Sequence, residues 1–213
     1  MTSLSDLDLD TVAREIAETP PLPEPEPELV AKAGAYLERR GWTKSVAGEA
    51  DFAAASLALA RCAMSDTQPS TLNPQPVRRL GIFAFGRYGC GKTALMRAIK
   101  PLFRPVHFVP LNDPEIAALL DEPEWIADAM RCNVILDDLG AESAVTDYGI
   151  KREFAAEFVV RYHREGGGRL FVTTNLTGEA IAERYTARFT SRIKELCIPL
   201  HLKGSDKRKW GAA

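Results

Sequence analysis

The residues whose types and spacing most clearly suggest chemistry lie in the segment GRYGCGKT, residues 86–93, called here the glycine loop. Gly86, Gly91, Lys92 and Thr93 satisfy the pattern G-x-x-x-x-G-K-[ST]. In this pattern the glycines bring backbone N–H groups against phosphate oxygens, the lysine supplies positive charge, and the threonine hydroxyl holds Mg²⁺. An apolar run precedes the loop and a helical pattern follows it, which favours a phosphate site over a chance glycine-rich turn. The candidate nucleotide-binding residues here are Gly86, Tyr88, Gly89, Cys90, Gly91, Lys92, Thr93 and Ala94.

A second acidic element, NVILDDLGAE, follows about 45 residues after the loop lysine. It reads as an apolar strand that ends in paired carboxylates. Asp137 is expected to bind Mg²⁺ through water. Asp138 is expected to point toward the attacking water, either as its general base or to orient it. Most ATPases of this broad class carry glutamate at the second position, which is one methylene longer. An acidic loop after a buried strand is the alternative, and the preceding glycine loop argues against it.

A third apolar run, LFVTTN, ends at Asn175. A neutral amide there can hydrogen-bond the attacking water or the γ-phosphate without adding charge. The alternative is that Asn175 caps the helix that follows, and Thr177 is an equally good cap.

Three arginines, Arg184, Arg188 and Arg192, are spaced by four, which predicts that they share one helical face. Such a stripe is often only solvated. It can also present an arginine to the nucleotide of a neighbouring subunit.

The elements that must position these residues alternate along the chain. Apolar runs separated by helical segments predict a parallel sheet with helices on both faces. The expected strands are 80–85, 106–111, 133–139, 169–175 and 197–203, and two helices are expected earlier, at 28–41 and 49–65. The predicted division is an acidic, proline-rich flexible tail (1–28), a small helical region (29–76) and an ATPase core (77–213).

Composition and charge do not indicate a function, but they restrict the expected partners, metal sites and cellular compartment. The net charge is −2, but residues 1–28 hold eight acids and one base, which leaves a body of about +5 that permits contact with nucleic acid. The four cysteines form no CxxC pair and are not expected to cluster with histidine, so a zinc site is not expected. Scattered cysteines and the lack of a signal peptide or an apolar span predict a cytoplasmic protein with no membrane partner.

Taken together, GRYGCGKT, VILDDLGAE, FVTTNL and RFTSRI resemble the DnaC-type bacterial and phage helicase loaders in order and spacing. These loaders are AAA+ ATPases, and the ending LKGSDKRK is similar as well. The resemblance covers about residues 78–209. It implies an α/β P-loop NTPase of three layers, α/β/α, around a parallel sheet. The chain ends just after Trp210, so no C-terminal helical lid is expected.

The resemblance also implies roles for residues. ATP and Mg²⁺ are assigned to Lys92 and Thr93, and metal binding and hydrolysis to Asp137 and Asp138. Asn175 corresponds to the γ-phosphate sensor. The remaining matches are Arg192 as the arginine finger, Arg188 as the second choice, and Arg208 as a basic residue near the C-terminus.

The partners implied by the family are a replicative helicase, single-stranded DNA bound weakly through phosphates, and further copies of the chain when ATP is bound. In that family the region before the core grips the helicase, whereas here residues 1–70 are short, acidic and proline-rich and do not extend the resemblance. A transposition helper ATPase of the IstB type, which serves a transposase, shares the same motifs and is the first alternative. A small-molecule P-loop kinase and a scaffold that binds nucleotide without hydrolysis are the others; the paired aspartates and TTN favour water as the phosphate acceptor.

Overall fold

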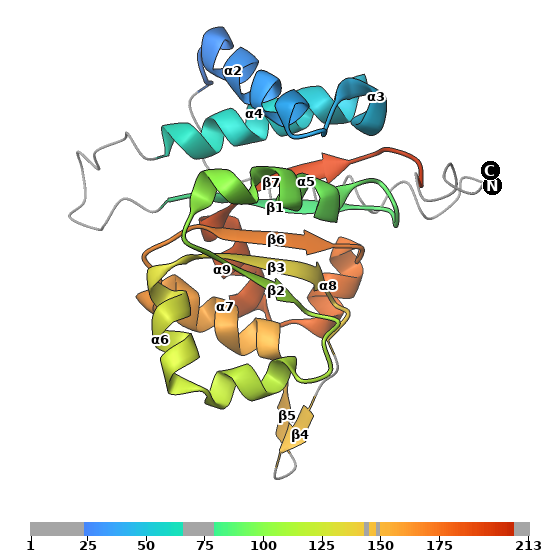
Figure 1. Ribbon diagram of the computed structural model, residues 1–213. Coiled ribbons are helices and arrows are strands. Elements are labelled where there is room, and N and C mark those ends of the chain that lie inside the picture. The colour runs from blue at the N-terminus through green and yellow to red at the C-terminus, as the bar shows by residue number, and fades with distance from the viewer. Residues whose placement is uncertain (1–23, 66–78, 143–144, 148–149, 207–213) are drawn as a thin grey trace, which may run out of the picture.

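Five parallel strands form the sheet at the centre of the computed structural model, which describes residues 24–65, 79–142, 145–147 and 150–206 (Figure 1). The strand order is β2-β3-β6-β1-β7, and every neighbouring pair is parallel. The strands are β1 (Gly81–Gly86), β2 (Val106–Pro110), β3 (Asn133–Leu139), β6 (Leu170–Thr174) and β7 (Cys197–Leu202). These agree with the five predicted strands to within a residue at each end. A short antiparallel pair, β4 (Val145–Asp147) and β5 (Ile150–Arg152), lies apart from the sheet.

Helices connect the strands and also precede them. The α-helices are α2 (Pro27–Arg39), α3 (Lys44–Ala47), α4 (Glu49–Met64), α5 (Lys92–Ile99), α6 (Pro123–Arg131), α7 (Phe154–Glu165), α8 (Gly178–Arg184) and α9 (Ala187–Leu196). Two 3₁₀ turns are η1 (Lys100–Phe103) and η2 (Ile116–Asp121). None of the helices in the described ranges is long and apolar enough to cross a membrane.

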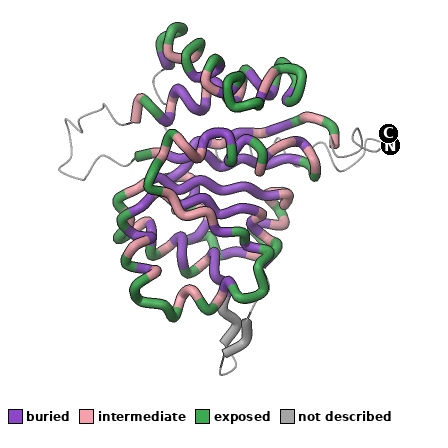
Figure 2. Tube along the Cα trace, viewed as in Figure 1, coloured by how far each residue is buried: buried purple, intermediate pink, exposed green. Residues whose placement is uncertain are grey.

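Both faces of the sheet are covered, which explains why its strands are apolar without alternation. All six residues of β1 are buried. Ile82 and Ala84 belong to a core shared with α2, α4 and α5, whereas Phe83 and Phe85 belong to a core shared with α6, α7 and α9. Figure 2 shows the resulting band of buried chain through the strands. The predicted layered α/β arrangement is therefore present.

The helical region before β1 is joined to the sheet by polar contacts as well as by packing. Asp51 of α4 is 5% exposed, and its two carboxylate oxygens accept the backbone N–H groups of Lys203 (2.9 Å) and Gly204 (2.8 Å), just after β7. A buried carboxylate that is hydrogen-bonded in this way lowers the stability of the fold far less than one whose partners have been removed. Asp51 therefore fixes α4 over the β7 edge of the sheet.

The prediction of one arginine face is wrong. Arg184 is the last residue of α8, and a new helix, α9, begins at Ala187. The hydroxyl of Thr186 accepts the N–H of Phe189 at 3.3 Å, so Thr186 caps α9 and separates the two helices. Spacing by four places side chains on one face only within a continuous helix. Arg188 and Arg192 share α9, and Arg184 does not.

Candidate active site

The glycine loop joins the end of β1 to the start of α5 and depends on glycine. Gly89 and Gly91 have φ values of +76° and +101°, in the left-handed region that glycine adopts without strain. A Cβ atom on Gly89 would lie 1.8 Å from Oδ1 of Asp206, so a larger residue there would have to displace Asp206. Gly91 is the residue before α5, so the backbone N–H groups at the start of that helix open toward the loop. This arrangement suits an anion.

Lys92 lies inside the loop rather than in solvent. Its side chain is 5% exposed, and Nζ donates hydrogen bonds to the carbonyl oxygens of Gly86 and Arg87, both at 2.8 Å. The Sγ atom of Cys90 lies 3.6 Å from Nζ, and Cys90 is fully buried. A buried ammonium is stable only where acceptors surround it. The loop therefore holds a positive charge at its centre.

Thr93 and Asp137 meet at the ends of α5 and β3. The Thr93 hydroxyl donates to Oδ1 of Asp137 at 3.0 Å, and the Thr173 hydroxyl of β6 donates to the same oxygen at 2.7 Å. Asp137 is 7% exposed, so this carboxylate is held in place by two hydroxyl groups. The two residues predicted to serve a metal, Thr93 and Asp137, are thus in direct contact. Sequence reasoning missed the part of Thr173, although it lies beside the predicted Asn175.

Asp138 has an unusual backbone that brings it to the same edge of the sheet. In a regular strand, neighbouring side chains point to opposite faces, so Asp137 and Asp138 would diverge. The register of β3 against β6 shifts between Leu136 and Leu139, and Asp138 has a φ of +65°. It is the one non-glycine residue with positive φ in the described ranges. A positive φ at a non-glycine residue indicates a functional role when neighbouring groups hold the backbone in that conformation.

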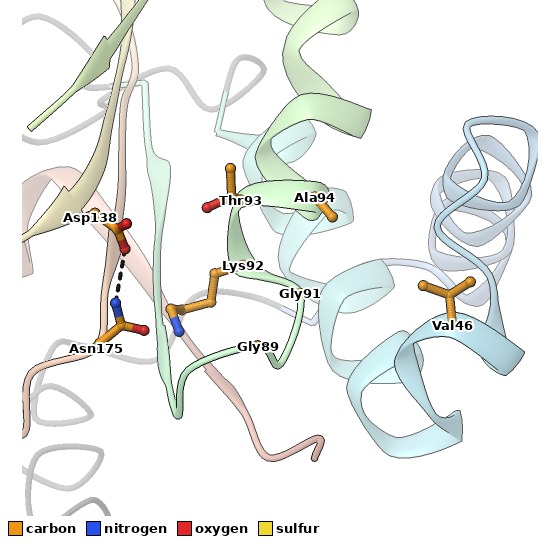
Figure 3. A pocket seen from close by; sticks show the side chains of 8 residues that line it. All are labelled: Val46, Gly89, Gly91, Lys92, Thr93, Ala94, Asp138 and Asn175. Atoms are coloured by element: carbon orange, nitrogen blue, oxygen red, sulfur yellow. Dashed lines mark hydrogen bonds between the residues drawn. The ribbon is translucent and has the colours of Figure 1, made fainter. Parts of the chain in front are cut away.

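The surroundings of Asp138 do maintain that backbone. The N–H of Asp138 donates to the Thr173 hydroxyl at 2.8 Å, and Nδ2 of Asn175 donates to Oδ1 of Asp138 at 2.9 Å (Figure 3). Capping of the next helix falls to Thr177, whose hydroxyl accepts the N–H of Ala180 at 3.2 Å. The amide of Asn175 is thereby left to orient the carboxylate of Asp138.

A pocket of about 280 Å³ lies where these elements meet (Figure 3). Its lining combines the start of α5 with the ends of β3 and β6, although these segments are distant in sequence. The lining residues are Val46, Gly89, Gly91, Lys92, Thr93, Ala94, Asp138 and Asn175. Seven of the eight were predicted as site residues. Gly86, Tyr88 and Cys90 are in the loop but outside the lining, and Tyr88 is 68% exposed.

The remaining lining residue, Val46, comes from α3 in the helical region that precedes the sheet. The nearby Trp42 is 2% exposed, and its Nε1 would lie 3.6 Å from a Cβ atom on Gly91. Sequence reasoning treated residues 29–76 as a separate region and missed this wall. No local pattern could have revealed it, because Val46 and Gly91 meet only through the packing of α4 on β1 and β7.

The loop after Asp138 is fixed by a buried acid. Glu142 is 3% exposed, and its Oε2 accepts the N–H of Gly140 at 2.7 Å. Arg184 donates to the carbonyl oxygens of Gly140 and Glu142, each at 2.5 Å, and the Tyr185 hydroxyl donates to Oε1 of Glu142. Burial, followed by the charge of Glu142, raises the pKa of Tyr185, which keeps this hydroxyl protonated as a donor. Arg184 thus positions the segment that carries Asp138.

The other predicted arginines lie away from the pocket lining. Arg192 of α9 pairs with Glu195 at 2.5 Å, and its guanidinium is 3.4 Å from Nε2 of His163. Arg188, one turn earlier on α9, is exposed. Arg208 lies outside the described residues.

No family model matches the chain, and no curated protein matches it either.

Proposed function

We propose that this chain is an AAA+ ATPase of the helicase-loader type, which binds ATP with Mg²⁺ and uses hydrolysis as a switch on a replicative DNA helicase. The observation that carries the ATPase proposal is that Lys92, Thr93, Asp138 and Asn175 line one pocket. Behind that lining, the Thr93 hydroxyl donates to Asp137. A cationic loop, a hydroxyl beside a carboxylate, and a second carboxylate beside an amide are the parts that phosphoryl transfer to water needs. The helicase partner rests on the motif resemblance.

The donors at the pocket fit a magnesium nucleotide. The Thr93 hydroxyl and the Asp137 carboxylate are hard oxygen ligands, which Mg²⁺ prefers in combination with phosphate oxygens and water. A bound Mg²⁺ neutralises charge on the β and γ phosphates. The N–H groups of the glycine loop and the Lys92 ammonium bind the phosphates, and the start of α5 adds its dipole. Thr173 keeps Asp137 aimed at Thr93.

The hydrolytic step is assigned to Asp138. Its carboxylate takes a proton from the attacking water, while the oxygen of that water forms a bond to phosphorus and the bridging oxygen leaves with the electron pair. Asn175 donates to Oδ1 of Asp138, which leaves Oδ2 to accept the proton. The left-handed backbone at Asp138 compensates for the short aspartate side chain, because it turns the carboxylate into the pocket.

Replacing Asp138 with asparagine tests this assignment. Asparagine tolerates a positive φ as aspartate does, so the fold and nucleotide binding should persist. Turnover of ATP should fall at least about 100-fold, because the general base is lost. We would measure steady-state phosphate release with Mg²⁺, with and without single-stranded DNA, and nucleotide affinity by fluorescence titration. Asp113→Asn, in an exposed turn after β2, is the control.

The ATPase proposal would be rejected if the wild-type chain neither binds ATP in the fluorescence titration nor releases phosphate. An Asp138→Asn variant that turns over ATP at the wild-type rate would reject the general-base role of Asp138. The helicase assignment has its own test. Wild-type chain with ATP should place a replicative hexameric helicase on a single-stranded circle, and an ATPase that has no such effect would instead direct attention to a transposase partner.

A second variant tests the wall made by α3. Val46 is 42% exposed and lines the pocket, so glutamate there puts a negative charge beside the phosphates without disturbing a packed core. We expect Val46→Glu to weaken ATP binding about tenfold through charge repulsion. Ser45→Glu, the preceding residue on α3, lies outside the lining and serves as control. Equal affinities for the two variants, measured at low salt, would remove α3 from the site.

A further inference from the structure

A second group of polar side chains lies near the start of β3, away from the pocket. His107 of β2 and Asp128 of α6 are in direct contact, with Nε2 and Oδ2 separated by 2.7 Å. The Sγ atom of Cys132 lies 3.9 Å from the same Oδ2. One atom from each residue lies within 4.8 Å of the other two. The expectation that no histidine clusters with a cysteine is therefore wrong, because pairing of β2 with β3 brings His107 next to Cys132.

The donor set has a chemical preference. Imidazole nitrogen, thiolate sulfur and carboxylate oxygen are the three protein ligands of Zn²⁺, and a thiolate is a poor ligand for Mg²⁺ or Ca²⁺. Asp128 lies in the last turn of α6 and Cys132 is the residue that follows the helix, and the end of α6 brings their side chains together. Three protein ligands leave one position of a tetrahedron for water.

The surroundings hold these donors on rigid elements. His107 lies in β2 opposite Val134 of β3, and the ring of Trp125 packs edge-on against its imidazole, with the ring centroids 5.8 Å apart. The carbonyl of Cys132 accepts the Tyr162 hydroxyl at 2.7 Å, which fixes the backbone there.

The two oxygens of Asp128 are also divided between partners. Arg131 lies 3.5 Å from Oδ1, so Oδ2 faces the histidine and the cysteine. Contacts of this kind behind a ligand orient it toward a metal.

From these contacts we infer that His107, Asp128 and Cys132 form a binding site for one Zn²⁺ ion. Ligand atoms around a tetrahedral zinc ion are roughly 3.3–3.6 Å apart, given bonds of about 2.0–2.3 Å. The Asp128–Cys132 separation is close to that value, and the His107–Asp128 hydrogen bond opens by less than about 1 Å to reach it. The Cys132 thiol gives its proton to solvent as the S–Zn bond forms.

This site is independent of the proposed ATPase. Asp137 lies five positions after Cys132 along an extended chain, a distance of about 16 Å, near the opposite end of β3. Loss of ATP hydrolysis would therefore leave the zinc proposal standing, and the reverse also holds.

The test uses the full chain, freed of metal by chelation and kept reduced. Equilibrium dialysis with Zn²⁺ should find about one ion per chain, with proton release on binding. Co²⁺ is the spectroscopic probe, because a thiolate ligand produces a charge-transfer band. Cys132→Ala should lose that band and bind Zn²⁺ at least about 100-fold more weakly, and His107→Gln should weaken Zn²⁺ binding by a similar factor. Cys62→Ala, a buried cysteine of α4, is the matched control and should keep both signals.

Three results would overturn the inference: no stoichiometric Zn²⁺ on the wild-type chain, Zn²⁺ binding by Cys132→Ala at wild-type affinity, or an equal loss in Cys62→Ala. Two variants on different elements guard against misfolding, because β2 carries His107 and the end of α6 precedes Cys132. Their circular dichroism spectra and melting curves without metal should match those of the wild-type chain. If the hydrogen bond between His107 and Asp128 serves only to stabilise the fold, the wild-type chain will bind no zinc, which is the first of these results.

Discussion

Replacement of Lys92 by alanine is expected to abolish ATP turnover, with a loss of about 10³-fold. The reason lies in where the ammonium is held. Nζ is bonded to the carbonyl oxygens of Gly86 and Arg87 at 2.8 Å, inside the turn around which phosphate oxygens would gather. A fixed charge in a nearly water-free position stabilises a phosphate far more than one in solvent does. The measurements are phosphate release and nucleotide affinity.

The control for Lys92 comes from the same helix. Lys100 follows the other end of α5 and lies over the ring of Phe108, so Lys100→Ala removes a lysine without touching the pocket. It should turn over ATP normally. The melting temperature of Lys92→Ala should stay near that of the wild-type chain, because the loop loses a buried charge along with its hydrogen bonds. If Lys92→Ala hydrolyses ATP at the wild-type rate while it remains folded, the glycine loop is not a phosphate site.

Much of the fold and site follows from local sequence patterns. The apolar runs around Phe83, Ile135 and Val172 are strands because both faces of a parallel sheet are covered by helices. Polar residues that end such runs must meet at one edge, since the strands are parallel. That rule brings the ends of β3 and β6 to the glycine loop, where Asp138 and Asn175 line one pocket.

Other features of the fold and the site were missed by the sequence patterns. A left-handed aspartate at position 138 follows from the register shift against β6, not from the residue type. The break between Arg184 and Arg188 is local: the hydroxyl of Thr186 accepts the N–H of Phe189 and begins a new helix, which the spacing of the arginines by four does not reveal. Val46 reaches the pocket because α4 packs on the β7 edge, a contact between segments about 150 residues apart. Tertiary packing decides the backbone at Asp138 and the position of Val46, whereas the helix break depends on the local cap at Thr186.

Arg192 is expected to act on the nucleotide of a neighbouring subunit. The ATP turnover lost in Arg192→Ala should therefore return when it is mixed with a chain that keeps Arg192 but lacks Lys92. Arg192→Ala alone should turn over ATP about 10³-fold more slowly. Within its own subunit Arg192 pairs with Glu195 at 2.5 Å, on a partly exposed surface. An exposed pair is worth at most about 1 kcal/mol, so a triphosphate in a neighbouring subunit can compete for the guanidinium.

Mixing Arg192→Ala with Lys92→Ala creates interfaces at which an intact Lys92 site meets an intact Arg192. With random assembly, about a quarter of the wild-type rate should return. The matched control mixes Arg192→Ala with a chain that carries both substitutions, which can form no complete interface and should stay inactive.

A second variant, Arg188→Ala, distinguishes the two arginines of α9, because Arg188 is exposed and lies one turn earlier on the same helix. If Arg188→Ala shows the loss and the rescue while Arg192→Ala is active, the trans arginine is Arg188. Full activity of both would mean that each site is complete within one chain, because neither α9 arginine lies in the lining of its own pocket.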